Sequence, residues 1–170
     1  MSSRSLVVSG LCVVAAVAGA AGLPRRGSER DRDASPVTGG ATGEALVTRV
    51  VDGDTAILST LGRSRFIGVD TPEVFGHRDC FGPQASAFTK RTLTGLRVRY
   101  EIGAEPRDRY GRALVYLDLP DGRSFNEQLV ARGYARPLPI APNTRYAERF
   151  ARLARAASSA GRGLWSVCPA

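Results

Sequence analysis

Short stretches in which apolar and polar residues alternate occur through the middle of the chain, and this period of two predicts β-strands. The predicted strands cover residues 45–51, 55–59, 63–69, 97–102 and 113–119. Gly62 marks a hairpin between the second and third of them, and Asp121-Gly122 marks a turn after the last.

Three other segments have the spacing of amphipathic helices. We predict helices over residues 82–96, with Pro83 in the first turn, over 125–132, ended by Gly133, and from Asn143 as N-cap to about Ala160. Leu164 then adds apolar mass that can pack back on the body. Five short strands with helices inserted late favour an α+β, mainly β protein: a five-stranded barrel with about three packed helices, and not a parallel sheet.

The N-terminal region has a different pattern. Residues 1–23 contain one positive charge, Arg4, then an apolar stretch and small residues, which is typical of a signal peptide cleaved after Ala20. The alternative is an uncleaved membrane anchor over residues 6–23. Residues 24–43 are polar and without period, so we predict a disordered linker, followed by a domain over 44–170. The protein is therefore expected to be secreted or in the cell envelope, or else membrane-anchored.

The formal net charge of the 170 residues is +8, which favours a polyanionic partner such as nucleic acid. With a single histidine in the chain, His77, neither a histidine zinc site nor a serine–histidine nucleophile is expected.

Two acidic turns interrupt the first three predicted strands. Asp52-Gly53-Asp54 lies between the first two, and Asp70, followed by Thr71-Pro72-Glu73, ends the third. An Asp-Gly pair alone is a common hairpin turn. Together, however, the two turns offer the carboxylate and carbonyl oxygens that a hard cation such as Ca²⁺ takes in an open, water-bearing site.

Two arginines lie close to these turns in the predicted fold. Arg65 begins the strand that Asp70 ends, and Arg112 ends the turn Arg109-Tyr110-Gly111-Arg112. Such a basic turn is often only a solvated surface feature. Two guanidinium groups beside a metal would nevertheless stabilise the charge that grows on a phosphate during its hydrolysis.

Several longer motifs carry a resemblance. They are Val-Val-Asp-Gly-Asp-Thr (50–55), Arg-Phe-Ile-Gly-Val-Asp-Thr-Pro-Glu (65–73), Phe-Gly-Pro-Gln-Ala-Ser-Ala-Phe-Thr-Lys (81–90), Asp-Arg-Tyr-Gly-Arg-Ala (108–113), Asn-Glu-Gln-Leu-Val-Ala-Arg-Gly (126–133) and Leu-Trp (164–165). In this order, over about residues 46–166, they make the chain similar to the staphylococcal nuclease family. The resemblance implies an OB-fold barrel, one bound Ca²⁺ ion and hydrolysis of DNA and RNA phosphodiesters to leave 3'-phosphates. It also implies a monomer that prefers single-stranded substrate.

The resemblance also implies a role for each matching residue. Asp54 and Asp70 match direct metal ligands, Thr71 matches a ligand through its main-chain carbonyl, and Asp52 matches an outer-shell acid. Glu73 matches the carboxylate that orients or deprotonates the attacking water. Arg65 and Arg112 match the arginines that hold the phosphate, and Arg109 and Tyr110 match residues that contact the terminal phosphate of the substrate.

The chain departs from the family between Tyr134 and Pro142. An alignment through Leu129-Val130 and Pro142-Asn143 puts Pro139 and Ala141 where the type member has tyrosines that pack on the nucleotide. We therefore expect weaker or differently selective substrate binding, because a stacked base is worth about 1 to 3 kcal/mol.

Cys80 and Cys168 remain once Cys12, in the predicted signal segment, is set aside. Two cysteines in an exported chain most simply form a disulfide, here between the loop after the second acidic turn and the C-terminal tail.

Two other hypotheses compete with a nuclease. The domain can be a non-catalytic OB-fold module that binds nucleic acid or protein, or the metal can be only structural. A module that has lost its site should lack at least one of Asp54, Arg65, Asp70, Glu73 and Arg112, and all five are present.

Overall fold

We describe a computed structural model in which residues 38–76 and 78–168 are placed. The predicted signal or anchor segment and most of the predicted linker lie outside these residues. Within them, no helix is both long and apolar enough to cross a membrane.

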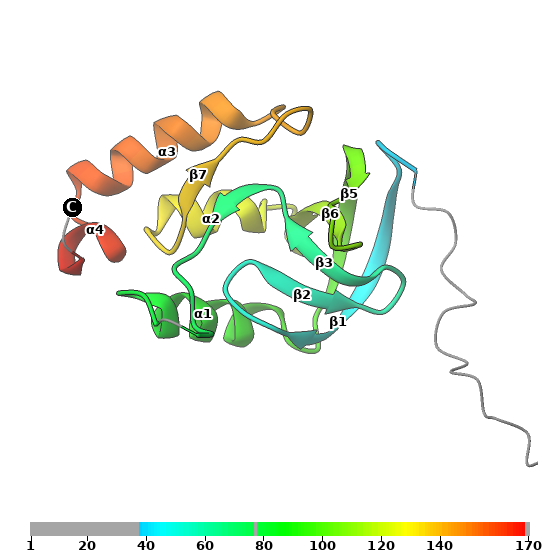
Figure 1. Ribbon diagram of the computed structural model, residues 1–170, viewed down its shortest axis with the longest axis horizontal. Helices are drawn as coiled ribbons and strands as arrows, with labels where there is room; N and C mark the ends of the chain where they lie inside the picture. Colours follow the sequence, from blue (N-terminus) through cyan, green and yellow to red (C-terminus); the bar gives the residue numbers. More distant parts are fainter. Residues whose placement is uncertain (1–37, 77, 169–170) are drawn as a thin grey trace, which may run out of the picture. The chain divides into compact units, whose positions relative to one another are not determined.

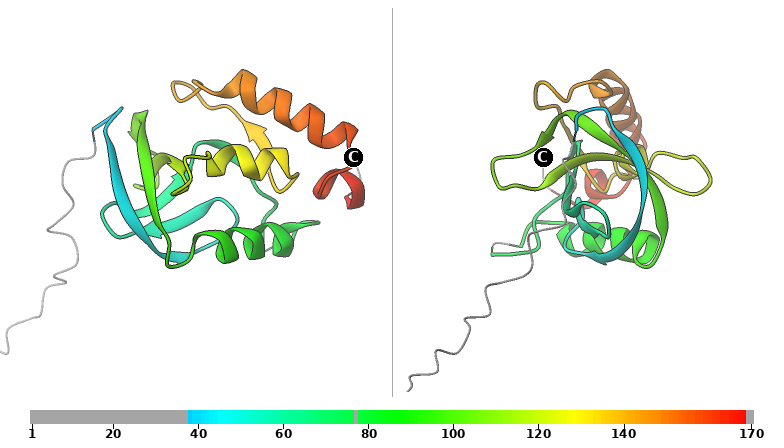
Figure 2. Two further views of the ribbon diagram at one scale, coloured as in Figure 1. Left: turned by 180° about the vertical axis from the view of Figure 1, so that it is seen from behind. Right: turned by 90° about the vertical axis from the view of Figure 1, so that its right-hand side faces the viewer.

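Five strands close into a barrel, as the sequence pattern predicts (Figures 1 and 2). They are β1 (Thr42–Val50), β2 (Thr55–Leu58), β3 (Gly62–Phe66), β5 (Arg97–Arg107) and β6 (Ala113–Asp118). Around the barrel the order is β1-β2-β3-β6-β5, and β5 pairs again with β1. All neighbours are antiparallel except β3 and β6, which run parallel, so that Arg65 lies opposite Leu114. In β1 and β3 alternate residues such as Ala45, Val47 and Phe66 are buried, and the buried residues of the five strands form much of the core.

The third predicted strand is divided in two. Pairing within the barrel ends at Phe66, and Gly68–Asp70 forms a separate strand, β4, which pairs with β7 (Arg136–Leu138), an element that the sequence did not reveal. The division falls at Gly68, whose φ of 76° is unfavourable for residues with a side chain. A Cβ atom there would also lie 2.6 Å from a ring carbon of Phe150. The turn redirects the chain so that Asp70 ends a strand outside the barrel.

In the described part of the chain, four helices accompany the barrel: α1 (Gly82–Leu93), α2 (Phe125–Ala131), α3 (Ala147–Ser159) and the short α4 (Leu164–Val167). Figure 1 draws α2 between α1 and α3, to one side of the strands. The helix predicted to Leu96 ends at Leu93, because Thr94 is extended and Gly95 has a φ of 76°.

The N-terminal boundary of the last long helix was predicted wrongly. Helix α3 begins at Ala147, and Asn143 does not cap it. Instead the Asn143 amide accepts a hydrogen bond from the Glu105 N–H and donates one to the Glu105 carbonyl, both at 3.0 Å. The side chain therefore fastens the segment before α3 to strand β5.

Helix α2 holds the barrel and the site-bearing strands together. The buried amide of Asn126 accepts a hydrogen bond from the Leu117 N–H (3.0 Å) and donates to the carbonyl of Ile67 (2.9 Å), which links β3 to β4. Beside it, the Phe125 ring meets Phe66 edge-on at 5.7 Å and stacks on Phe88 at 5.9 Å. These contacts position the end of β3 relative to α1 and β6.

Candidate metal and phosphate site

The two predicted acidic turns lie in direct contact. A Cβ atom on Gly53 would be 2.5 Å from the Thr71 hydroxyl oxygen, so only glycine allows this approach. The carbonyl of Gly53 accepts a hydrogen bond of 2.6 Å from Thr89 on α1, and the Asp52 carboxylate accepts one of 3.1 Å from the Asp54 N–H. The first turn is thus fixed from both sides.

Asp54 connects the turns chemically. Its Oδ2 atom accepts hydrogen bonds from both the N–H (2.8 Å) and the hydroxyl (2.9 Å) of Thr71. Its Oδ1 atom accepts one from the Thr55 hydroxyl at 3.2 Å. At 6% exposure, Asp54 is a nearly buried acid that orders the second acidic turn.

Arg65 lies between the two aspartates of the predicted metal site. One guanidinium nitrogen forms an ion pair with Asp54 Oδ1, and the other donates to Asp70 Oδ1 at 3.0 Å. Burial lowers the pKa of Arg65 from its ordinary value, which Asp70 opposes and the nearby charge of Arg112 reinforces. Arginine is still a cation at neutral pH. The two carboxylates thus converge on one positive group.

Asp52 stands at the edge of this cluster. Burial raises the pKa of its carboxyl, while hydrogen bonds from Thr55 and the charge of Arg65 act in the opposite direction. Asp52 is therefore an acid whose charge interacts with Arg65, and its role as an outer-shell partner of a metal stays a prediction.

Arg112, on the turn just before β6, has a charge that acts on Arg65. Its Nε atom donates to Asp108 at 2.6 Å, and its N–H donates to the other oxygen of that carboxylate at 3.0 Å. Although burial acts to raise the pKa of Asp108, hydrogen bonds from Arg112 and Tyr110 hold it below its ordinary value. Our sequence reasoning missed Asp108. Aspartate opening a turn that ends in glycine is a signal by which it can be found.

Arg109 and Tyr110 occupy the tip of this turn. The Tyr110 side chain is exposed, and its hydroxyl accepts a hydrogen bond of 2.7 Å from Arg109. The guanidinium carbons of Arg109 and Arg112 lie 4.8 and 5.4 Å from the centre of its ring. The turn therefore presents two cations and an aromatic hydroxyl to solvent.

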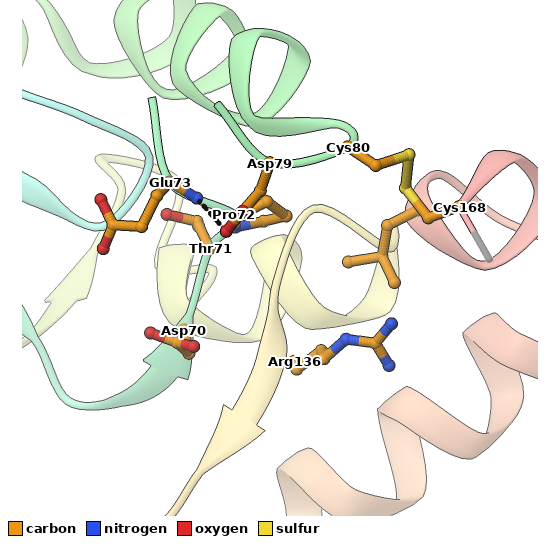
Figure 3. Close-up of a pocket in the computed structure, with 9 residues that line it drawn as sticks. Asp70, Thr71, Pro72, Glu73, Asp79, Cys80, Arg136 and Cys168 are labelled. Carbon is orange, nitrogen blue, oxygen red and sulfur yellow. Dashed lines mark hydrogen bonds between the residues drawn. A yellow bond between two sulfur atoms is a disulfide. The ribbon is translucent and has the colours of Figure 1, made fainter. Parts of the chain in front are cut away.

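Glu73 follows Asp70 on the second acidic turn and is exposed. Figure 3 shows its carboxylate pointing away from the Cys80–Cys168 disulfide, whereas its backbone N–H faces Asp79. Within the described residues, no hydrogen bond or ion pair engages this carboxylate, which leaves it available to a water molecule.

The chemistry of the donor set fits a hard cation. In the described part of the chain, no three side chains of the histidine, cysteine or acidic type form a ready metal cage. Asp54 and Asp70 nevertheless converge on a point that already stabilises positive charge, and a main-chain carbonyl at Thr71 would add a third oxygen. Calcium accepts such a set when water completes its shell.

The structure thus brings Asp52, Asp54, Arg65, Asp70 and Thr71 together and sets Arg112 near Arg65. Glu73 lies on the same turn as Asp70 and Thr71, and Arg109 and Tyr110 lie on the turn that leads to Arg112. Their individual roles stay predictions. Cys80 and Cys168 form a disulfide with their Cα atoms 5.7 Å apart.

A closed five-stranded barrel of this kind, with helices packed beside it, is an OB fold of the α+β class. Residues 63–167 match the family model described as staphylococcal nuclease homologue, and the chain belongs to that family.

Known members of the family are similar over much of the chain. The thermonuclease of Staphylococcus hyicus is 41% identical over 126 residues, which cover 71% of this chain and 74% of that protein. The thermonuclease of Staphylococcus intermedius is 47% identical over 107 residues, or 59% of this chain and 63% of that protein. Endonuclease YncB of Bacillus subtilis (strain 168) is 33% identical over 126 residues, 69% of this chain and 59% of that protein.

Proposed function

We propose that this protein is a calcium-dependent nuclease that hydrolyses phosphodiester bonds of DNA and RNA and leaves 3'-phosphates. The observation that carries the proposal is the position of Arg65, held between Asp54 and Asp70 with the charge of Arg112 close by. Family membership and the names of the relatives support it. A barrel that only binds nucleic acid has no need of this combination.

In the proposed reaction the two arginines bind the phosphate that is attacked. Arg65 and Arg112 offer planar guanidinium groups that can donate two hydrogen bonds each to phosphate oxygens and stabilise the charge that develops on them. Asp108 orients Arg112 by holding both its Nε atom and its backbone N–H. The ion, when bound, supplies positive charge beside the phosphate and favours ionisation of water.

Glu73 is assigned to the attacking water. Its free, exposed carboxylate accepts a hydrogen bond from the water and orients it, or takes its proton. Asp54 and Asp70 would hold the ion, Thr71 would add its carbonyl, and Asp52 would act from the outer shell. Arg109 and Tyr110 bind the terminal phosphate of the substrate.

The substrate is proposed to be single-stranded by preference and the protein a monomer, secreted or in the cell envelope. The disulfide supports an extracytoplasmic location, because such bonds persist in oxidising compartments.

The first test is cleavage of single-stranded DNA by the purified protein with Ca²⁺ and with a calcium chelator. We expect cleavage when Ca²⁺ is present and none when the chelator removes it. In Glu73→Gln, which loses the proton-accepting carboxylate, kcat should fall by a factor of about 10² to 10⁴. Glu148→Gln is the matched control, because Glu148 is an exposed acid on α3 that is far from the site in sequence. Binding without cleavage by the folded protein would instead support the binding-module hypothesis, and unchanged kcat in Glu73→Gln would contradict the role of Glu73.

A second test concerns the segment where family tyrosines are missing. Pro139 and Ala141 are exposed, and two large aliphatic side chains lie beside Pro139: Leu138 at 39% and Ile140 at 63% exposure. Aliphatic groups offer a base no ring to stack on. We expect Ile140→Tyr to lower the KM for a single-stranded oligonucleotide. The gain in binding free energy should be at most that of one stacked base, about 1 to 3 kcal/mol. An unchanged KM would show that this segment does not contact the substrate.

A further inference from the structure

The loop that carries Glu73 connects two regular elements, and the contacts of its backbone decide where the Glu73 carboxylate lies. Strand β4 ends at Asp70 and helix α1 begins at Gly82, so Glu73 lies on an irregular connection. A catalytic group misplaced by about 1 Å can lose about 10²-fold in rate. Residues that fix the backbone of Glu73 should therefore affect kcat.

Asp79 binds both polar backbone groups of Glu73. Its Oδ2 atom accepts a hydrogen bond from the Glu73 N–H at 3.1 Å, and its own N–H donates to the Glu73 carbonyl at 3.0 Å (Figure 3). The Asp79 carbonyl in turn accepts a bond of 3.1 Å from the Gly82 N–H. A Cβ atom on Gly82 would come within 2.4 Å of the Glu73 carbonyl oxygen, so the start of α1 lies directly against this residue.

The disulfide ties Asp79 to the body of the protein. Cys80 follows Asp79 and is bonded to Cys168, just after α4. Helix α4 is anchored: Leu164 is 1% exposed, and its N–H donates to the carbonyl of Gly133 at 2.9 Å. The bridge thus connects the loop to a buried point beyond α2.

A pocket lies beside the loop, between the second acidic turn and the C-terminal tail. Its volume is about 310 Å³, and its lining includes Asp79, both cysteines, Leu164 and Arg136 (Figure 3). The ring of Phe81, next to Cys80, stacks on Tyr134 at 5.6 Å and packs the α1 end of the loop. Beside Glu73 itself, the hydrogen bonds of Asp79 and the disulfide restrain the backbone.

We propose that Asp79, tethered by the Cys80–Cys168 disulfide, is a positioning residue for Glu73, and that reduction of the bridge lowers turnover. The inference rests on the proposed function. In the reductive step a dithiol such as dithiothreitol gives two electrons and two protons to the disulfide, its S–S bond breaks into two cysteine thiols, and the reagent closes into its own cyclic disulfide. The loop then loses its link to α4, and the Glu73 carboxylate samples unproductive positions.

Steady-state cleavage of single-stranded DNA at saturating Ca²⁺ tests the role of Asp79. We expect Asp79→Ala to lower kcat about tenfold with KM unchanged, because the substrate is held by other residues. Asp79→Asn should restore most of the activity, because its amide oxygen can still accept from the Glu73 N–H. Asp121→Ala is the matched control: this exposed carboxylate likewise accepts a backbone N–H in a turn, from Arg123 at 3.0 Å, but lies after β6. A kcat for Asp79→Ala within twofold of wild type would overturn the proposal.

The bridge is tested with dithiothreitol and, independently, with Cys80→Ser/Cys168→Ser. Each should lower kcat about as much as Asp79→Ala does, and combining the cysteine changes with Asp79→Ala should cost much less than the product of the two effects, because both act through one loop. Circular dichroism at the assay temperature establishes that each variant is folded. Full activity of the folded, reduced protein would refute the tether.

Hydrogen exchange provides a readout that needs no cleavage. The Glu73 amide should be protected in the oxidised protein and exchange several-fold faster after reduction or in Asp79→Ala, while buried barrel amides such as that of Leu117 keep their protection. Unchanged exchange at Glu73 would disprove the tether even if the protein proved to have no nuclease activity. Conversely, faster exchange with no cleavage by wild type would place the failure in the proposed function alone.

Discussion

Replacing Arg65 with alanine is expected to lower kcat for cleavage of single-stranded DNA by about 10² to 10³, the usual cost of removing one preorganised charge donor. The side chain is fixed before substrate arrives, by Asp54 on one nitrogen and Asp70 on the other. Arg65→Lys should recover little of the loss, since an ammonium group cannot reproduce the planar, two-pronged contact with phosphate.

Arg63→Ala is the matched control for this substitution. Arg63 lies two residues earlier on β3, is exposed and has no salt bridge in the described part of the chain; its charge acts on the site only weakly, as the last of the causes that lower the pKa of Asp52. It should therefore change kcat by less than twofold. Thermal unfolding has to be followed in parallel, because alanine at position 65 leaves the nearly buried Asp54 without its counter-charge. Equal kcat values for the two folded variants would disprove the assignment of Arg65 to the phosphate.

The largest loss of stability is expected from Phe125→Ala. The Phe125 side chain is fully buried and touches the rings of Phe66 and Phe88, so its removal leaves a cavity between the barrel, α1 and α2. We expect the free energy of unfolding to fall by about 3 to 5 kcal/mol. Urea denaturation at fixed pH measures this.

Phe75→Ala makes the same chemical change at a site that is 63% exposed. Its effect should stay within about 0.5 kcal/mol. A loss below about 1 kcal/mol for Phe125→Ala would mean that the barrel and α2 do not depend on this contact for their association.

The sequence pattern was sufficient to predict the barrel, because short apolar runs, alternating with polar residues most clearly in β1, are each bounded by turn residues. It was not sufficient for β4 and β7. Their separation from the barrel depends on the left-handed backbone of Gly68 and on the ring of Phe150, which is distant in sequence. Asn143 had the local signature of a helix cap but found a better partner in Glu105, again through a contact formed only by the tertiary fold.

The candidate site divides in the same way. Asp54, Arg65 and Asp70 belong to short motifs in which charged residues interrupt or end apolar strands, so they could be predicted from the sequence. The structure brings all three together. Asp108 accepts hydrogen bonds from the backbone and side chain of Arg112, and Asp79 accepts one from the backbone of Glu73. Their type and spacing alone do not distinguish them from ordinary turn residues.

The parallel pairing of β3 with β6 affects the order in which parts of the candidate site assemble during folding. The β2–β3 hairpin can form from local sequence, but its parallel partner follows only after α1 and β5 have been traversed. Contacts of such long sequence separation carry a loop-closure cost and tend to form late. Arg65 and Arg112 therefore become neighbours only when the barrel closes. A nascent chain that has not yet reached β6, or a fragment truncated before it, therefore lacks one of the two arginines that we propose bind the phosphate.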